Sequence, residues 1–308
     1  MITVSHLEKS FGSVKAVDDI SFEIKTGDIV GFLGPNGAGK STTMRLLTGY
    51  LIPDSGTIHI DNKSLLTKGA SALEQIGYLP ENNPLYSDLL VKEFLSLSAE
   101  LKHIPQEKRT EALDFAIEST AIKDVFFRPI GELSKGYKQR VGIAATIIHQ
   151  PKTIILDEPT EGLDPNQRNE IRSLIKSLGK THTIIMSTHV MQEAQAVCNR
   201  LLVINKGRLV ADGSADQIAK TIGKQKVILF DLEGKYVDTQ LQKLRDFEIT
   251  IEKTRRPQRF VGRVFLTHGM KEIQPEISRL AAKNNWVIWK LTEQENKLED
   301  IFAELTME

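Results

Sequence analysis

The chain has 308 residues, enough for two domains, and its forty basic and forty acidic side chains cancel. This balance gives no reason to expect nucleic acid or an anionic surface as a partner. A single cysteine excludes an internal disulfide framework and fits a reducing compartment. No N-terminal signal region is visible, and the longest apolar run (141–148) is far shorter than the roughly 18 residues of a spanning helix. We therefore expect a chain that is soluble by itself and reaches a membrane only through a partner.

Residues 1–27 alternate between apolar and polar side chains, which predicts antiparallel strands. Phe11 and Gly12 stand at the bend between two of these strands. An aromatic ring at this bend either stacks on a nucleotide base or plugs the edge of the sheet. The residues alone favour the plug.

The apolar run Ile29–Leu33 predicts a buried parallel strand, and an apolar-periodic helix follows it. Between them lies the pattern G-x-x-x-x-G-K-[ST] of a phosphate-binding loop, whose glycines let backbone N–H groups turn toward a phosphate. The helix N-terminus adds its positive end. We predict a nucleoside triphosphate site in which Lys40 meets the β- and γ-phosphates and the Ser41 hydroxyl is a Mg²⁺ ligand. The loop consists of Gly34, Pro35, Asn36, Gly37, Ala38, Gly39, Lys40, Ser41 and Thr42.

From residue 82 to about residue 150 no strand pattern appears, which predicts a helical insert. Within this insert Ser134 resembles a helix N-cap, and Gly136 leaves the backbone open. Ordinary capping is a sufficient explanation of this segment from the residues alone. The stretches with helical spacing are 91–101, 107–117 and 135–149.

A second buried strand, residues 153–156, ends in two adjacent acids, Asp157 and Glu158. Ligands of α/β proteins bind at the carboxyl ends of parallel strands, so Asp157 is suited to hold Mg²⁺ and Glu158 to polarise a water molecule. The alternative is that the two acids simply begin a loop. The strand 183–186 leads in the same way to His189, for which a phosphate contact and a structural role are equally supported.

From about residue 221 the elements follow in the order β-α-β-β-α-β, which predicts a small ferredoxin-like domain over 221–308. A helix is expected over 297–305. One connection in this domain is basic and is most simply a solvated hairpin tip, with lipid headgroups or RNA as the alternative contact. Its basic residues are Lys253, Arg255, Arg256 and Arg259.

Together, these motifs resemble the ATP-binding subunits of ABC transporters over residues 1–220. The resemblance implies an α/β P-loop NTPase cassette, with a mixed sheet, an antiparallel β subdomain and a helical insert at about 82–150, followed by an accessory α+β domain at 221–308. The matching segments are 34–42 (Walker A), 154–158 (Walker B), 133–138 (family signature), Leu163-Asp164 (D-loop) and His189 (switch histidine).

The resemblance implies ATP and Mg²⁺ as ligands and a head-to-tail homodimer, or a paired cassette, that encloses two ATP molecules. Ser134 and Gly136 of one chain would cap the γ-phosphate held by Lys40 of the other. Glu158 would activate the attacking water, with His189 beside the phosphoryl group. Hydrolysis would drive multi-spanning membrane permease subunits docked on the helical insert, at the cytoplasmic face of the inner or plasma membrane. No nucleic acid is expected.

The resemblance also changes the interpretation of Phe11, which by position becomes the residue that stacks on adenine. Two positions depart from the family pattern. The signature usually reads Ser-Gly-Gly-Gln, where this chain has 134–137 as Ser-Lys-Gly-Tyr. The usual Q-loop glutamine is Glu81, a carboxylate that phosphates repel unless Mg²⁺ lies between them. Glu81 is therefore either a metal ligand or a coupling residue at the boundary of the insert.

The C-terminal tail, with the segment 298–302, resembles the exporter branch that has separate membrane subunits. Residues 78–86 further resemble the subgroup named for gliding motility. The competing class is a soluble ABC-type ATPase of translation or DNA maintenance, which usually carries two cassettes or long coiled coils. A small P-loop kinase is less suitable because the signature would have no role in it.

Overall fold

The computed structural model describes residues 1–65, 67, 69–222, 225–244, 247–254, 256–267 and 272–294. These residues form two compact units, the first over residues 1–215 and the second from residue 216 onward. The boundary expected at residue 220 falls inside helix α8 (Ala215–Ile222). The helix expected over 297–305 lies outside the described residues.

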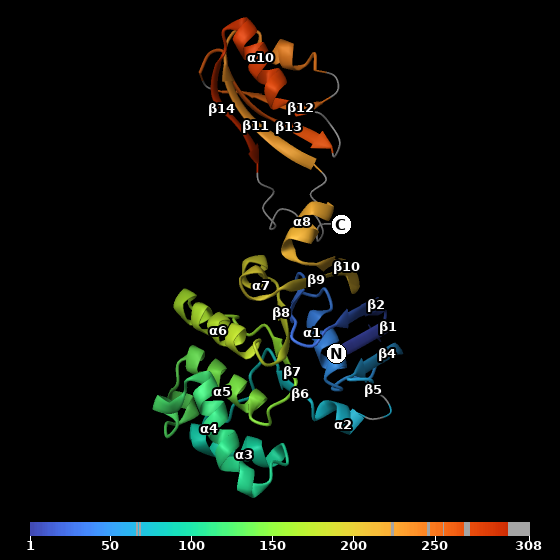
Figure 1. The fold of residues 1–308 in the computed structure, drawn as a ribbon, viewed down its shortest axis with the longest axis vertical. Helices are drawn as coiled ribbons and strands as arrows, with labels where there is room; N and C mark the ends of the chain where they lie inside the picture. The colour runs from blue at the N-terminus through green and yellow to red at the C-terminus, as the bar shows by residue number, and fades with distance from the viewer. Residues whose placement is uncertain are drawn as a thin grey trace. The chain divides into compact units, whose positions relative to one another are not determined.

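Unit 1 is built on a six-stranded sheet whose central strands are parallel (Figure 1). β10 runs antiparallel to β9, so the sheet is mixed, as expected. The central strands are apolar on both faces because both faces are covered. In spatial order the strands are β10 (Arg208–Gly213), β9 (Arg200–Asn205), β3 (Ile29–Leu33), β8 (Thr183–Thr188), β7 (Thr153–Asp157) and β6 (Ile76–Leu79).

An antiparallel sheet covers one face of this central sheet, with helix α1 (Lys40–Leu47) in the core between them. Side chains of both sheets, among them Phe22 and Phe32, pack in this core with their ring centroids 5.9 Å apart. The predicted antiparallel strands of residues 1–27 are thus confirmed. The strands are, in spatial order, β2 (Val14–Ile24), β1 (Ile2–Phe11), β4 (Ser55–Ile60) and β5 (Lys63–Ser64).

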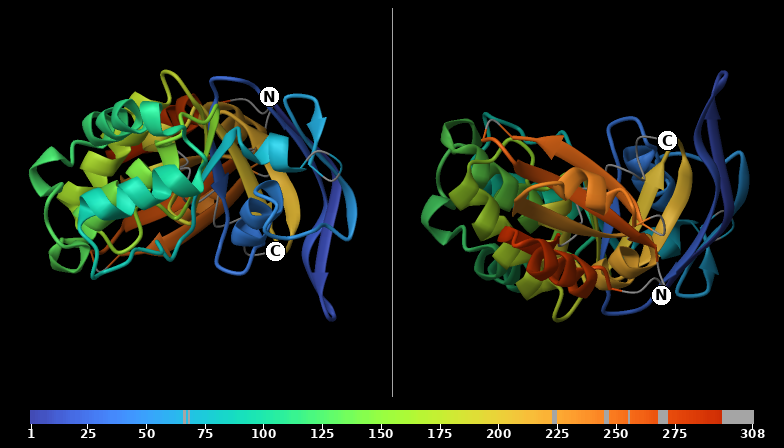
Figure 2. Two further views of the ribbon diagram at one scale, coloured as in Figure 1. Left: turned by 90° about the horizontal axis from the view of Figure 1, so that it is seen from below. Right: turned by 90° about the horizontal axis from the view of Figure 1, so that it is seen from above.

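Helices cover the opposite face, and alternate residues of β7 show the division: Ile155 faces the antiparallel sheet, whereas Ile154 and Leu156 face the helices. Figure 2 shows the helical group in green and the antiparallel sheet in blue on opposite sides of unit 1. The helices on this face are α3 (Val91–Leu101), α4 (Arg109–Thr120), α5 (Lys135–Ile147) and α6 (Pro165–Leu178). The shorter α7 (Met191–Val197) packs on β3 and β8, and the short α2 (Gly69–Leu73) packs with the antiparallel sheet.

The helix expected over 107–117 begins later, at Arg109, because residues 106–108 form a 3₁₀ turn after Pro105. Two further 3₁₀ turns, at 123–125 and 130–132, lead toward α5. No helix in the described part of the chain is long and apolar enough to span a membrane.

Unit 2 is an antiparallel four-stranded sheet in the order β12-β13-β11-β14, which is the predicted ferredoxin-like arrangement. Its core contains the buried side chains of Phe230 and Val264 from the sheet and of Ile277 from helix α10. The elements are β11 (Gln225–Glu233), α9 (Val237–Leu241), β12 (Glu248–Lys253), β13 (Arg259–Thr267), α10 (Gln274–Asn284) and β14 (Val287–Gln294).

The predicted basic hairpin tip is smaller than expected. The guanidinium group of Arg259 is paired with the carboxylate of Asp231 at 2.7 and 2.8 Å and lies 4.7 Å from the ring centroid of Trp289. Arg259 is therefore part of the sheet and not of a solvated tip. Arg255 lies outside the described residues.

Candidate functional site

The phosphate-binding loop connects β3 to α1 at the carboxyl edge of the central sheet. Gly39 directly precedes α1 with φ of 106°, a conformation that L side chains rarely adopt. A Cβ atom at this position would lie 2.2 Å from the carbonyl oxygen of Ala16, on β2. The loop therefore requires glycine here, both for its backbone conformation and for its close approach to the antiparallel sheet.

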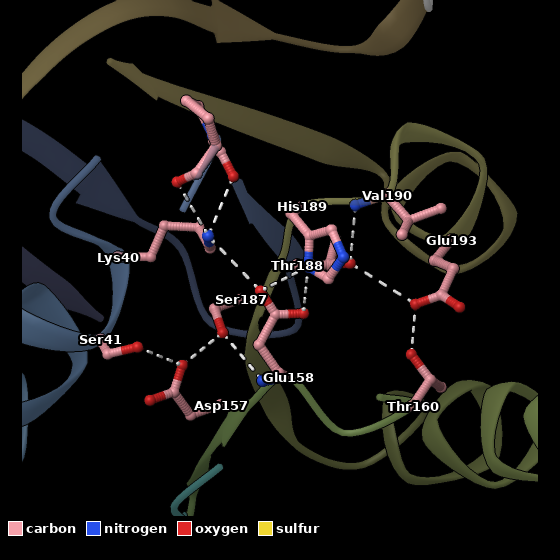
Figure 3. Close-up of polar contacts among 12 residues, drawn as sticks. Lys40, Ser41, Asp157, Glu158, Thr160, Ser187, Thr188, His189, Val190 and Glu193 are labelled. Carbon is pink, nitrogen blue, oxygen red and sulfur yellow. Dashed lines mark hydrogen bonds and ion pairs between the residues drawn. The ribbon is translucent and has the colours of Figure 1, made fainter. Parts of the chain in front are cut away.

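Lys40 is the first residue of α1, and its side chain is only 6% exposed. Its Nζ donates hydrogen bonds to the carbonyl oxygens of Gly34 (2.9 Å) and Pro35 (3.2 Å). The same Nζ lies 3.4 Å from Oε1 of Glu158, at the end of β7 (Figure 3). A buried ammonium group requires such partners, and together they hold the Lys40 charge inside the loop.

Asp157 lies where the phosphate loop, β7 and β8 meet, with 1% of its surface exposed. The hydroxyls of Ser41 (3.2 Å) and Ser187 (2.5 Å) both donate to its Oδ1. The backbone N–H of Glu158 donates in turn to the Ser187 hydroxyl at 2.9 Å. Ser187 was not among the predicted site residues, although it stands at the end of β8 as Asp157 does at the end of β7.

The oxygens of Ser41 and Asp157 fit a Mg²⁺ ion. Two adjacent ligands of an octahedral Mg²⁺ lie about 3 Å apart, close to the observed 3.2 Å. Hydroxyl and carboxylate oxygens are also the ligand types that Mg²⁺ prefers. The two predicted ligands are thus side by side at the sheet edge.

Glu158 and His189 contact each other directly. Nδ1 of His189 donates toward both carboxylate oxygens of Glu158, at 3.1 Å each. Glu158 is 8% exposed and has φ of 48°, a left-handed conformation that costs about 1–3 kcal/mol in a residue other than glycine. The turn at Glu158 aims its carboxylate away from β7 and toward Lys40 and His189 (Figure 3).

A cavity of about 280 Å³ opens beside these groups and is lined by six residues of the predicted loop together with three glutamates. Burial and the negative charges of Glu161, Asp157 and Glu158 raise the pKa of Glu81, and Lys40 acts in the opposite direction. The lining residues are Ala16, Asn36, Gly37, Gly39, Lys40, Ser41, Thr42, Glu81, Glu158 and Glu161.

The predicted residues Phe11, Ser134 and Gly136 do not line this cavity. Phe11, at the end of β1, is half exposed, so its ring does not plug the sheet edge. Ser134 is the N-cap of α5 and accepts a hydrogen bond from the backbone of Tyr137 at 3.3 Å. Gly136 is buried against α6, where a Cβ atom would lie 2.9 Å from the side chain of Gln167.

The two unusual signature residues have contacts within unit 1. The Tyr137 hydroxyl donates to Asp124 at 2.5 Å, and the ring lies 5.9 Å from the Arg140 guanidinium. The Lys135 amine reaches the backbone of Gly162, where an added Cβ would lie 2.0 Å from its Nζ. A neighbouring cavity of about 650 Å³ has Lys135 and Gly162 in its wall together with Glu158.

The sequence interpretation also missed a buried group behind Glu158 and His189, formed by Thr160, Thr188 and Glu193. The available signal was weak. An acidic residue in the short apolar helix α7 could have been recognised as buried only once the packing of that helix was known.

A glycine loop between a parallel strand and a helix, a buried lysine within it, and two acids at the carboxyl end of another parallel strand of the same sheet define a P-loop nucleotide-binding protein. A family model described as "ABC transporter" matches residues 17–161. The bacitracin transport ATP-binding protein of Bacillus licheniformis is 33% identical over 311 residues, which cover 99% of this chain and 97% of that protein. The chain therefore belongs to the ATP-binding subunits of ABC transporters, a family of ATPases.

Two further similarities agree with this family. The Nod factor export ATP-binding protein I of Rhizobium sp. (strain N33) is 35% identical, over 74% of this chain and 76% of that protein. The solved structure of CbiO1 from Clostridium perfringens, part of an ABC transporter complex, is 32% identical with a TM-score of 0.65, over 71% of this chain and 90% of that chain. These relatives favour a transporter subunit over a soluble ABC ATPase or a P-loop kinase. The likeness to the gliding-motility subgroup stays a prediction.

The raised pKa of Glu81 predicts a pH dependence of stability. A carboxyl group whose pKa rises on folding stabilises the fold below its unfolded pKa, and this contribution is lost as the pH rises through the folded pKa. Glu81→Gln removes the ionisation, so the melting temperature of the wild type relative to this variant should fall as the pH rises above about 4.5. Thermal unfolding of both proteins between pH 4 and pH 7 measures this difference. Glu118→Gln, on α4, is the control for loss of one carboxylate, and a constant difference for Glu81→Gln would contradict the prediction.

Proposed function

We propose that this chain hydrolyses ATP to power export through membrane-spanning subunits that are separate chains. The observation that carries the proposal is the contact of Lys40, Glu158 and His189 at the edge of the phosphate loop. Relatives named for bacitracin transport and Nod factor export support the transport assignment. The subunit would work at the cytoplasmic face of a membrane, held there by its partners.

The proposed chemistry rests mainly on charge and position. The loop N–H groups and Lys40 would bind the β- and γ-phosphates, and Phe11 would stack on adenine. Ser41 and Asp157 would hold Mg²⁺, which supplies positive charge to the phosphate oxygens. Glu158 would then accept a proton from the attacking water. His189, whose N–H already points at Glu158, would keep that carboxylate oriented and stand beside the transferred phosphoryl group.

Replacement of Glu158 by glutamine tests this chemistry. Glu158→Gln keeps the shape of the side chain but removes the base, so turnover should fall by roughly two to four orders of magnitude. ATP affinity should change little, because Lys40 and the loop remain. Steady-state hydrolysis and fluorescent-nucleotide binding measure the two quantities. Near-normal hydrolysis by the folded variant would exclude Glu158 as the base.

The proposed active form is a head-to-tail dimer. Ser134 is exposed at the N-terminus of α5, outside its own chain's phosphate cavity. Lys135 and Lys138 stand in the first turn of that helix, which has no acidic residue. This arrangement concentrates positive charge and free N–H groups at one surface point, which suits the phosphate of a nucleotide held by a second chain.

The dimer predicts an ATP-dependent change of mass. Glu158→Gln protein should shift toward the dimer when ATP is added, because slow hydrolysis preserves the bridging nucleotide. Adding Ser134→Arg should block the shift by filling the contact point without abolishing ATP binding. Ser177→Arg, at an exposed serine of α6, is the matched control. Multi-angle light scattering that gives one mass with and without ATP, over a wide concentration range, would refute the sandwich dimer.

The proposed docking surface for the membrane subunit is the segment 81–93, which begins the helical insert. Leu85 and Leu89 pack against the helical core, so they are poor candidates for contacts with a partner. Tyr86 is 59% exposed, and its ring meets Phe94 edge-on with centroids 6.1 Å apart. An exposed aromatic side chain with a polar end suits an interface, which makes Tyr86 the best anchor in this segment.

Tyr86→Asp tests the docking surface. A charged side chain at a desolvated contact should weaken binding to the membrane subunits by about tenfold or more. The basal ATPase activity and the melting temperature of the isolated chain should remain near those of the wild type. Sedimentation with membranes that contain the permease measures binding, and Tyr236→Asp, at an exposed tyrosine of unit 2, is the control. Unchanged membrane binding by folded Tyr86→Asp would remove this surface from the mechanism.

A further inference from the structure

Glu193, in the first turn of α7, is a buried carboxylate that no step of the proposed hydrolysis uses; 4% of its surface is exposed. Its Oε2 accepts hydrogen bonds from the hydroxyls of Thr160 and Thr188, the latter at 3.4 Å. Its Oε1 lies 3.7 Å from a guanidinium nitrogen of Arg168 and 3.6 Å from one of Arg172, both on α6. One carboxylate thus binds four side chains from three segments of the chain.

The two threonines lie next to the proposed catalytic groups in the chain. Thr160 follows Glu158 by two residues, and Thr188 directly precedes His189. The hydroxyl of Thr188 also accepts the backbone N–H of Val190 at 3.1 Å, which fixes the turn after the histidine (Figure 3). The buried carboxylate of Glu193 therefore contacts the same two segments that carry Glu158 and His189, whose side chains contact each other at 3.1 Å.

Charge explains why this position has an acid. An unpaired carboxylate is costly to bury, and two guanidinium groups offset that cost here. In the described part of the chain the buried Nε atoms of Arg168 and Arg172 have no hydrogen-bond partner. A second guanidinium nitrogen of Arg172 donates to Oδ1 of Asn169 at 3.4 Å, within α6 itself, so the pairs with Glu193 are the contacts that join these two guanidinium groups to another segment. Loss of the negative charge would remove this polar link between α6 and the two loops, while the apolar face of α6 would stay packed in the helical core.

Helix α6 extends this connection to the signature segment. Gln167, beside Arg168, packs so closely on Gly136 that a Cβ there would lie 2.9 Å from it. The first turn of α6 thus touches the signature on one side and the Glu193 group on the other.

We propose that Glu193 is a positioning residue for ATP hydrolysis. It holds the Glu158 and His189 loops in one arrangement and ties both to α6, so that a displacement of α6 at the signature reaches the catalytic base. This inference rests on the proposed function, because it assumes that Glu158 and His189 act on ATP. If Glu193 only stabilised the fold, its replacement would lower the melting temperature, the ATP affinity and the turnover together.

The test compares Glu193→Gln with Glu170→Gln in the full chain. Glu170 is on α6 and pairs with Arg140 at 2.7 Å, but unlike Glu193 its own side chain is 57% exposed. Glu193→Gln should lower kcat by about 10- to 100-fold while the KM for ATP stays within about threefold, since displaced catalytic groups lose rate more than binding. Glu170→Gln should leave both constants near those of the wild type.

Thr160 provides a second pair of variants if Glu193→Gln does not fold. Thr160→Val removes the hydroxyl with little change of shape and should also lower kcat, whereas Thr160→Ser keeps the hydroxyl and should restore it. In a Glu158→Gln background, Glu193→Gln should cause little further loss, because the residue acts through that base.

Three results would overturn the inference: unchanged kcat in Glu193→Gln, equal losses in Thr160→Val and Thr160→Ser, or additive losses with Glu158→Gln. A proportional loss of kcat, ATP affinity and melting temperature would show a stability role instead. Failure of the proposed function itself looks different, since the wild type would then not hydrolyse ATP or Glu158→Gln would hydrolyse it normally.

Discussion

The burial of a single ammonium group, that of Lys40, organises the functional edge of unit 1. A charge with 6% exposure requires partners, and it has two carbonyl oxygens of its own loop and the carboxylate of Glu158. β3, β8 and β7 are neighbouring parallel strands, so their carboxyl ends lie at one edge of the sheet. Glu158, which follows β7, can therefore reach Lys40, which lies in the loop after β3. The contact of His189 with Glu158 then adds the loop after β8.

The charges around this lysine bear on the proposed binding of nucleotide together with Mg²⁺. Glu81, Glu158 and Glu161 line the phosphate cavity, and Asp157 lies just beneath it. Three phosphates brought among these carboxylates would be repelled unless metal charge accompanied them. Burial first, and then the negative charges of Glu161, Asp157 and Glu158, raise the pKa of Glu81. This charge distribution supports the proposal that the nucleotide binds as a metal complex.

In the proposed mechanism the helical part of unit 1 also links the signature segment to the Glu158 and His189 loops. α5 and α6 cover the sheet, yet their N-terminal turns lie beside each other at the surface, with Gly136 against Gln167. α6 continues from there to Arg168 and Arg172 and the buried Glu193. Only a few contacts therefore connect the surface expected to meet a second chain with the loops of Glu158 and His189. A rigid helix such as α6 would transmit a displacement along this connection.

Most of the architecture could be predicted from the sequence, because it depends on residues that are close to one another in the chain. The phosphate loop, the acids after β7 and the histidine after β8 follow short apolar strands, and parallel strands bring such ends to one edge whatever the rest of the chain does. The β-α-β-β-α-β order of unit 2 was visible for the same reason, since alternation and helical spacing are properties of neighbouring residues. Helix limits were less exact, as at α4, where a 3₁₀ turn delays the start to Arg109.

Contacts between distant segments were decided only by the tertiary structure. Ser187 beneath Asp157, Arg259 paired with Asp231, and Gly136 against Gln167 each join residues whose own neighbours give no sign of the partner. Glu193 is the clearest case: a glutamate in a short helix is ordinarily exposed, and this one is buried because α7 turns it toward Thr160, Thr188 and two arginines. The packing of the elements decides which face of a helix is buried and which residues lie opposite it. The residues next to Glu193 in the sequence do not contain this information, because its partners come from distant segments.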